Sequence, residues 1–332
     1  MGAVLTTKTF EIGVGAWALG REGSGASFAD QAAFAESLGF HSFWLPENHF
    51  GDVSSLPAPL LLLAAASAKT CRIRLGTGSY LLPIRHPVQM AEEVAVLDRL
   101  SEGRVILGVG RGYHGGMFAA FDTPSRDKRR RFEEALERMI SAWKGEAVAY
   151  DPGTGPEKAG AGDPIYLAPS PVQKPHPPVW VAAFGPKALE QAGRLGLPYL
   201  ASPIEALSTL EENFARHREA AEEGGQTYPD AVPVMRTIFV SNDARKLAAI
   251  RDGLQAQASS LAKSPMPAIR RGVGRAVDDW AIVGEPEAVR EEIERYRERL
   301  GVTHFIASRS RLPSVTPAEM QASLELLAAA MG

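Results

Sequence analysis

The sequence has few of the features that would place a protein in a membrane or outside the cell. Its 332 residues include one cysteine, Cys71, so a framework of intrachain disulfides is excluded. The most apolar run, residues 60–68, falls far short of the ~20 residues that a membrane-spanning helix needs. The first ten residues carry Lys8 and lack the apolar core of a signal peptide. We therefore expect a cytoplasmic protein.

The sequence also lacks a strong excess of one charge and a set of closely spaced metal ligands. Lysine and arginine number 36 and aspartate and glutamate 39, which gives a formal net charge of −3. This balance makes nucleic acid and anionic membranes poor candidate partners. No two of the seven histidines are four residues apart, and the single cysteine offers no second thiolate, so no metal site is expected.

Short β-rich runs alternate with amphipathic helical segments along almost the whole chain, which is the pattern of βα units. Eight βα units without a break in composition favour one closed (β/α)8 barrel, the TIM barrel, with insertions. A doubly wound open sheet and a two-domain chain are the alternatives. We expect a single domain over residues 1–332, with strands at residues 10–16, 42–45, 73–79, 105–109, 179–183, 199–202, 232–240 and 303–307.

Helices are predicted between and after these strands, and proline opens several of them, where its missing N–H costs nothing. Residues 144–178 are rich in Gly and Pro and are interpreted as an insertion after the fourth helix. The basic and glycine residues within residues 264–277 indicate a mobile loop, which could act as a lid. The predicted helices span residues 28–38, 59–68, 87–100, 125–143, 186–195, 205–223, 244–261, 286–300 and 317–330.

In a TIM barrel the active site lies at the carboxyl ends of the strands, so the residues after each strand are the candidates. Glu47, Asn48 and His49 follow the second predicted strand directly. The imidazole of His49 can transfer protons near neutral pH. An ordinary polar loop with Pro46 as its turn residue remains the alternative interpretation.

Glycines interrupt the ends of the third and fourth predicted strands. Gly76 and Gly78 indicate a bulge or a ligand that approaches the backbone, or simply a strand end. Arg111 follows the fourth strand, and its fork of donors and permanent charge suit a phosphate. Residues 110–115 match G-x-G-x-x-G, but no helix is predicted before Ser125. A Rossmann dinucleotide site is therefore rejected.

A second candidate anion site follows the fifth strand. Gly185 permits close backbone approach, and the amides of Lys187 and Ala188 lie in the first turn of the predicted helix, where the helix dipole favours an anion. A plain βα turn is the alternative. Residues 284–287 form a rival phosphate site before the last barrel helix, but its two acidic residues would repel a phosphate.

Taken in order, these segments resemble the bacterial-luciferase-like family of flavin-dependent oxidoreductases. Residues 43–50, FWLPENHF, resemble the family's second-strand motif. Residues 74–112 match over one continuous block that includes LDRLSEGR at residues 97–104. The runs GEPEAV at residues 284–289 and GVTHF at residues 301–305 are also typical of the family.

The resemblance implies that FMN binds at the mouth of the barrel. Arg111 would hold its phosphate, helped by Tyr113 and by the backbone of residues 184–188. The Gly78–Ser79 peptide would be cis and lie against the flavin ring. The full set of cofactor-binding residues that the resemblance implies is Gly78, Ser79, Arg111, Tyr113, Phe184, Gly185, Lys187, Ala188 and Ser202.

Two positions depart from the luciferases themselves. Luciferases have a catalytic histidine where this sequence has Asn48, followed by a second histidine that corresponds to His49. Asn48 cannot act as an acid or base but can hydrogen-bond a substrate oxygen, which leaves proton transfer to His49 beside Glu47. Phe184 stands where luciferases have a carboxylate.

The resemblance implies a two-component monooxygenase that takes reduced FMN from a separate flavin reductase and uses O2 to oxygenate a small organic substrate. One alternative is an F420-dependent oxidoreductase, whose acidic cofactor tail could meet Arg270, Arg271 and Arg275. Another is a non-catalytic flavin-binding protein. The resemblance also implies a homodimer through the second and third barrel helices, and residues 59–68 are apolar enough for that role.

Overall fold

The computed structural model describes most of the chain. The described residues are 9–18, 25–51, 55–150, 163–264, 270, 274, 276–309, 312 and 315–332.

Eight parallel strands form the inner wall of the molecule, as predicted. Each pairs with the next along the chain, and the last, β12, pairs with β1. The ring closes between the sixth and seventh strands through a single bridge, Ala201 to Val234. The wall strands are β1 (Glu11–Gly15), β2 (Ser42–Leu45), β3 (Arg74–Thr77), β5 (Val105–Gly110), β8 (Val179–Ala182), β9 (Tyr199–Leu200), β10 (Pro233–Val240) and β12 (His304–Ser308).

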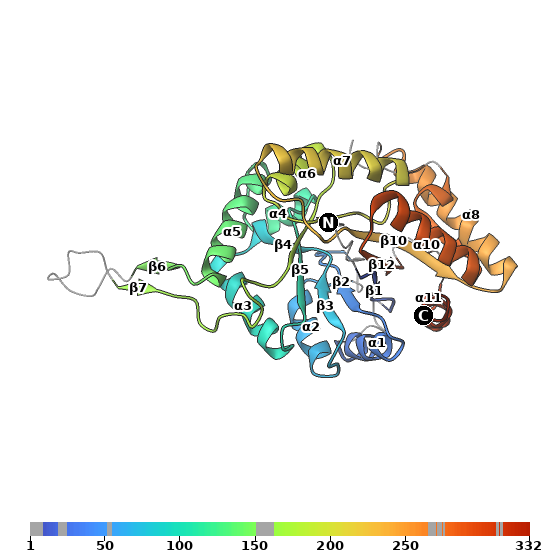
Figure 1. The fold of residues 1–332 in the computed structure, drawn as a ribbon, viewed down its shortest axis with the longest axis horizontal. Coiled ribbons are helices and arrows are strands. Elements are labelled where there is room, and N and C mark those ends of the chain that lie inside the picture. Colours follow the sequence, from blue (N-terminus) through green and yellow to red (C-terminus); the bar gives the residue numbers. More distant parts are fainter. Residues whose placement is uncertain are drawn as a thin grey trace, which may run out of the picture.

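Helices surround this wall, following the chain around the ring from α1 to α10 (Figure 1). The predicted TIM-barrel fold is confirmed, and the nine predicted helices lie within three residues of their expected ends. The helices are α1 (Gly25–Ser37), α2 (Pro59–Ser67), α3 (Pro87–Leu100), α5 (Lys128–Trp143), α6 (Pro186–Arg194), α7 (Leu207–Glu223), α8 (Ala244–Leu261), α10 (Pro286–Leu300) and α11 (Pro317–Met331). In the described part of the chain, no helix is long and apolar enough to cross a membrane.

Several short elements were not predicted. β4 (Tyr80–Leu81) pairs with β5, and β11 (Ala281–Gly284) pairs only with the second half of β10. The expectation that no helix opens near Gly115 is wrong, because α4 (Gly115–Ala120) begins there. The short turns η1 (Leu82–Ile84), η2 (Ser125–Asp127) and η3 (Val277–Asp279) complete the set. The Rossmann interpretation still fails, because the sheet is a closed barrel.

The two interruptions of the βα pattern differ in what the structure describes. Within residues 144–178, β6 (Ala149–Tyr150) and β7 (Pro164–Ile165) form an antiparallel hairpin that projects away from the barrel (Figure 1). The segment that joins these strands lies outside the described residues. Most of the predicted mobile loop at residues 264–277 also lies outside them, so its role as a lid stays a prediction.

The interior of the barrel is filled by large aromatic side chains. Trp44 from β2 stacks on Trp180 from β8, with ring centroids 5.1 Å apart. The glycine at 76 makes room for this pair, because a Cβ there would lie 2.4 Å from the Trp44 ring. The sequence suggested a bulge, a ligand or a strand end at Gly76, and the structure shows a neighbouring side chain instead. The stacked indoles therefore pack the inside of the barrel.

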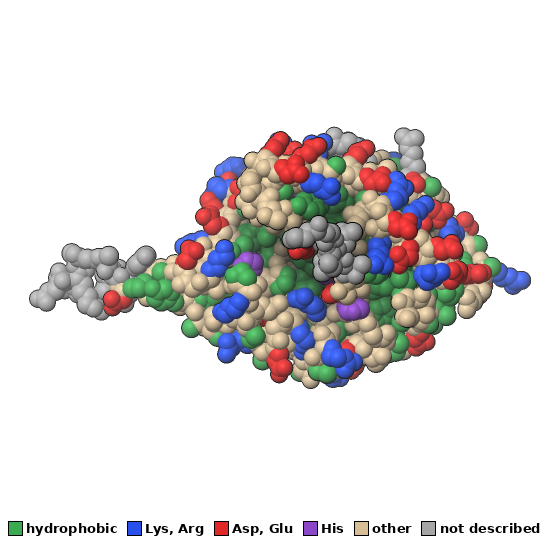
Figure 2. Space-filling view, viewed as in Figure 1, with side chains coloured by type: hydrophobic (Ala, Val, Ile, Leu, Met, Phe, Trp, Pro, Cys, Tyr) green, Lys and Arg blue, Asp and Glu red, His purple; other side chains and the backbone are tan. Residues whose placement is uncertain are grey.

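The outer layer separates charge from the core. Leucine, valine and phenylalanine side chains pack between the sheet and the helices as one cluster. Figure 2 shows charged side chains spread over the outer helices of the viewed face, with hydrophobic side chains gathered towards its middle. This is the pattern expected of amphipathic helices that cover a sheet.

The close approach of β3 and β5 gives a test of the barrel packing. A Cβ at Gly108 would lie 1.9 Å from the backbone oxygen of Thr77, an atom that cannot move without the sheet. We expect Gly108→Ala to lower the free energy of unfolding by about 1–3 kcal/mol, measured by denaturant titration. Gly115→Ala is the matched control, because nothing lies within 4 Å of a Cβ there. Equal denaturation midpoints for the two variants would contradict this account.

Candidate active site

A cavity of about 520 Å³ lies at the carboxyl ends of the barrel strands. Its volume falls in the range of cofactor and small-molecule sites. Its walls come from the segments after β2, β3, β5, β8 and β9, with one residue each from β10 and α5. The residues that line it are Glu47, Asn48, His49, Gly78, Ser79, Leu81, Gly110, Arg111, Gly112, Tyr113, His114, Met117, Lys128, Ala182, Ala183, Phe184, Leu200, Ala201, Ser202, Pro203, Ile204 and Met235.

Two cations share one part of this wall. Burial lowers the pKa of Arg111, and the nearby charge of Arg129 lowers it further. Burial also lowers the pKa of Lys128, as does the charge of Arg111. Within the described residues, neither cation has an ion pair with a carboxylate. Like charges held together at a cavity without a directly paired carboxylate make a binding place for an anion.

The predicted phosphate residue Arg111 is held towards α6. Its Nη1 donates to Gln191 Oε1 at 3.3 Å, and Gln191 Nε2 donates to Glu133 Oε1 at 2.6 Å. Since Gln191 belongs to α6, the guanidinium and the start of that helix face the same region. The charge of Glu133 also acts on Arg111 from a distance, but no ion pair joins the two side chains in the described structure.

The start of α6 contributes less to the cavity than its sequence suggested. Of the four residues predicted there, Phe184 lines the cavity, whereas Gly185, Lys187 and Ala188 do not. The amide of Ala188 already donates to the Gly185 oxygen at 3.0 Å. Gly185 has a φ of 88°, a conformation that glycine adopts readily. The structure therefore leaves the phosphate role chiefly to the Arg111 and Lys128 side chains.

The other predicted cofactor residues lie around the cavity. Gly78 and Ser79 line it, and the peptide bond between them is cis, as the resemblance implied. A Cβ at Gly110 would lie 2.3 Å from the Ser79 hydroxyl, so the two strand ends fit closely. Tyr113 stands at the rim with 72% of its surface exposed. Ser202 lines the wall after β9.

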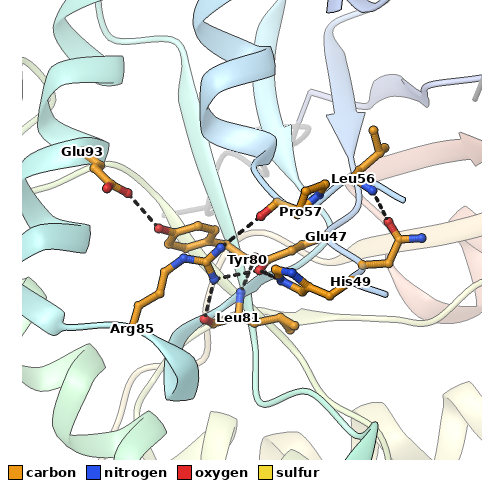
Figure 3. Close-up of polar contacts among 9 residues, drawn as sticks. Glu47, His49, Leu56, Pro57, Tyr80, Leu81, Arg85 and Glu93 are labelled. Carbon is orange, nitrogen blue, oxygen red and sulfur yellow. Dashed lines mark hydrogen bonds and ion pairs between the residues drawn. The ribbon is translucent and has the colours of Figure 1, made fainter. Parts of the chain in front are cut away.

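The three predicted catalytic residues separate into a buried pair and an exposed amide (Figure 3). The Glu47 carboxylate is fully buried and lies 2.6 Å from His49 Nε2. The same carboxylate receives the Leu81 amide at 2.9 Å and the Arg85 guanidinium at 2.7 Å. A buried charge with three donors is a satisfied charge. Glu47 is therefore a fixed anion that orients the His49 ring.

Arg85 links the Glu47 carboxylate to the loops around it. Its guanidinium donates to the carbonyl oxygens of Leu81 at 3.0 Å and Pro57 at 3.2 Å. It also lies over the Tyr80 ring, 4.4 Å from the centroid, which is a cation–π contact. The Tyr80 hydroxyl in turn donates to Glu93 at 3.0 Å. Figure 3 shows these groups as one continuous chain of contacts that ends at His49.

Asn48 has a structural partner of its own. Its side-chain Oδ1 accepts a hydrogen bond from the Leu56 backbone N–H at 2.6 Å, and its backbone N–H donates to the Leu56 backbone oxygen at 3.1 Å. These two bonds fix the loop after β2, so the side-chain oxygen is already engaged. Asn48 lines the cavity and is exposed, which places its amide group at the entrance.

Two phenylalanines hold the other sides of the His49 ring. The Phe121 centroid lies 5.0 Å from it, edge-on, and the Phe50 centroid lies 5.7 Å from it. Phe50 has a φ of 53°, and Asp122, next to Phe121, has a φ of 47°. Non-glycine residues in this region are strained and cluster at functional sites. The plane of the imidazole is therefore set by packing as well as by Glu47.

Sequence reasoning missed Arg85 and Lys128. Arg85 directly precedes a His-Pro pair inside the longest matched block, which was a usable signal. Lys128 opens a run of four basic residues, which is typical of a solvated helix face. The rival site at residues 284–287 does not line the cavity, and Glu287 there pairs with Arg290. No group of three or more possible metal ligands occurs among the residues that the structure describes.

The family of the chain follows from comparison with known proteins. Residues 10–304 match the family model described as luciferase-like monooxygenase. The chain belongs to the luciferase-like monooxygenase family. Limonene 1,2-monooxygenase of Rhodococcus erythropolis is 31% identical over 279 residues, which is 80% of this chain and 70% of that protein. The monooxygenase RslO1 from Streptomyces bottropensis has a TM-score of 0.77 at 28% identity, covering 97% of this chain and 98% of that one.

Other members of the fold use different flavins. The oxygenating constituent of 3,6-diketocamphane monooxygenase from Pseudomonas putida, solved with FMN, has a TM-score of 0.74 at 23% identity, covering 96% and 97% of the two chains. An F420-dependent secondary alcohol dehydrogenase has a TM-score of 0.71 at 21% identity, covering 96% and 99%. The chain spans just under two thirds, 64% and 63%, of two uncharacterized Sinorhizobium fredii relatives, which are 28% and 30% identical to it. The shared fold therefore leaves the choice of cofactor open.

The cation pair predicts that this luciferase-like protein binds simple phosphate. At ~100 times its Kd, inorganic phosphate should stabilise the folded wild type by about 2.7 kcal/mol. The midpoint of thermal unfolding should rise as a result. Arg111→Met should weaken phosphate binding roughly 10- to 100-fold, since it removes a charge-assisted hydrogen bond. Arg130→Met is the control, because Arg130 pairs with Glu134 on the exposed side of α5. Equal phosphate affinity in Arg111→Met and wild type would argue against this anion site.

Proposed function

We propose that the protein is an FMN-dependent monooxygenase that receives reduced FMN from a separate flavin reductase and uses O2 to oxygenate a small organic substrate. The observation that carries the proposal is one cavity that is lined both by two cations without a carboxylate partner, Arg111 and Lys128, and by a buried, oriented histidine, His49. A relative of the same fold is an oxygenating constituent that binds FMN, which supports the division of labour between two proteins.

The residues present fit a flavin phosphate. Arg111 and Lys128 supply positive charge without a bound carboxylate, and Gln191 orients the guanidinium. Gly78 and Gly110 line the cavity at positions where the packing leaves little room for a side chain, because a Cβ at either would lie 3.2 Å or less from a neighbouring side chain. When bound, reduced FMN supplies the electrons that activate O2.

His49 is the group that moves a proton. The carboxylate of Glu47, which also binds Arg85, accepts the hydrogen on Nε2 and so assigns the proton of the neutral imidazole to that nitrogen. Nδ1 is then the base and, once protonated, the acid. Phe50 and Phe121 pack on the ring, which limits the access of water to it.

The substrate is expected to be largely apolar. Charge is confined to the Arg111–Lys128 end of the cavity and to the His49 entrance, and most of the remaining wall is hydrocarbon or thioether. Such a lining binds by excluding water and orients its ligand through few polar contacts. The apolar side chains of the wall are Leu81, Met117, Phe184, Leu200, Ile204 and Met235.

The proposal is tested by anaerobic titration with reduced FMN, oxidised FMN and F420, followed by exposure to O2. Bound reduced FMN is expected to re-oxidise with kinetics distinct from those of the free flavin and to release hydrogen peroxide when no substrate is present. Tighter binding of F420 than of either form of FMN would favour the deazaflavin-dependent alternative. Binding of FMN without any change in its reaction with O2 would identify a non-catalytic flavin-binding protein.

Replacement of His49 should affect the reaction and spare binding. We expect His49→Gln to slow peroxide release from the bound flavin by about 10²- to 10⁴-fold, because general acid–base catalysis contributes that much. The Kd for FMN should stay close to the wild-type value. His41→Gln is the control, since His41 is exposed and precedes the same strand at its opposite end. An unchanged rate in His49→Gln would remove His49 from the mechanism.

We also propose that two copies associate through α2 and α3. Leu61 on α2 is 74% exposed, and Val96 and Leu100 on α3 are 43% and 58% exposed. Exposed apolar side chains on adjacent helices are typical of an interface. Leu61→Glu should convert a dimer into a monomer in analytical ultracentrifugation, whereas Leu195→Glu, at an exposed site after α6, should not. A monomeric wild type would contradict the proposal.

A further inference from the structure

The cavity wall after β9 is held by very little backbone pairing. β9 contributes two residues to the sheet, and beyond it a single bridge joins Ala201 to Val234. The next three residues, Ser202, Pro203 and Ile204, line the cavity. A segment that leaves the sheet this early needs other contacts to keep one position. Side chains from behind the wall supply them.

The first contact comes from Glu205, of which only 2% is exposed. Its Oε2 accepts the Ser202 amide at 3.0 Å and the Tyr199 hydroxyl at 2.7 Å. Its Oε1 accepts Asn213 Nδ2 at 2.8 Å. One buried carboxylate thus joins the end of β9, the start of the loop and helix α7.

The second contact comes from Arg236 on β10, which is completely buried. Its Nη1 donates to the Ser202 oxygen at 2.8 Å and to the Met235 oxygen at 2.9 Å, and the guanidinium lies 4.9 Å from the centre of the Tyr296 ring on α10. Its Nε and Nη2 have no hydrogen-bond partner among the described residues. The Ser202 N–H and C=O are therefore bound by two buried groups of opposite charge.

This arrangement is costly for the fold alone. Burial of a carboxylate or a guanidinium is unfavourable, and apolar side chains of similar volume usually pack at least as well. Burial raises the pKa of Glu205 to about 6, although Tyr199, Ser202, Arg236 and Asn213 all favour its charged form. Buried charges that converge on the N–H and C=O of one residue in a cavity wall indicate a role at that cavity.

We propose that Glu205 and Arg236 are positioning residues of the flavin site, which fix the Ser202 peptide against the cofactor and make flavin affinity depend on the ionisation of Glu205. The inference rests on the proposed function, because it assumes that the cavity holds a flavin. Neither residue lines the cavity, so both act through Ser202.

Glu205 is the group in this cluster that changes charge near pH 6. Burial raises the pKa of Tyr199 well above its usual range, so that phenol stays neutral. Burial lowers the pKa of His217, whose ring on α7 is 6.2 Å from that of Tyr199, which favours its neutral form. Protonation of Glu205 removes the charged acceptor of the Ser202 amide.

Affinity and stability should move in opposite directions. The folded pKa of about 6 lies above the ordinary value of 4.5, so the folded protein binds this proton more tightly than the unfolded chain. The contribution of Glu205 to stability therefore rises as the pH falls through this window. A loss of flavin affinity over the same range cannot then come from unfolding driven by this group.

The test measures FMN affinity by fluorescence at a series of pH values. Since the FMN phosphate also titrates near pH 6, the readout is the difference between variants. Between about pH 7 and about pH 5, the Kd of the wild type for FMN should rise roughly fivefold more than the Kd of Glu205→Gln. This factor is the expected difference between a charged and a neutral acceptor for the Ser202 amide. Glu212→Gln, exposed on α7, should match the wild type.

Tyr199→Phe provides a second measurement if Glu205→Gln does not fold. It removes a hydrogen bond that favours the charged carboxylate, so the midpoint of the affinity change should move to higher pH. Identical pH profiles for wild type and the Glu205 variant, or an unmoved midpoint in Tyr199→Phe, would overturn the inference. Absence of FMN binding at every pH in the wild type would instead refute the proposed function.

Discussion

Positive charge that no carboxylate pairs with directly is the constraint around which the cavity is built. Arg111 and Lys128 lie close enough for the charge of Arg111 to lower the pKa of Lys128, and within the described residues neither is paired with a carboxylate. An anionic ligand would relieve the repulsion between the two cations, which gives the cavity a preferred class of occupant.

Buried charged side chains of both signs hold two other parts of the cavity wall. Glu47 is bound by Arg85, by His49 and by a backbone amide, and so fixes the loop after β2. Glu205 and Arg236 bind the two ends of the Ser202 residue after β9. In both places a short strand ends early, and side-chain charge replaces the hydrogen bonds that a longer strand would provide. The site is thereby made rigid where the sheet itself gives little support.

The sequence predicted the barrel because its strands are apolar runs separated by helices with proline starts, and both signals are local. β11 escaped prediction because its four residues pair only with the end of β10. Arg111 was found from its place after a strand, whereas Lys128 was hidden in a basic run that looks solvated. Ala188 was predicted to bind with its amide, but that amide closes the first turn of α6. Gly76 faces a side chain that no sequence pattern could place opposite it.

A crystal structure of the complex with FMN tests the central claim most directly. The account predicts that the phosphate lies about 3 Å from both the Arg111 guanidinium and the Lys128 ammonium, the distance of a charge-assisted hydrogen bond. A phosphate at the start of α10, beside Glu285 and Glu287, or in any position that leaves the two cations without an anion, would contradict it.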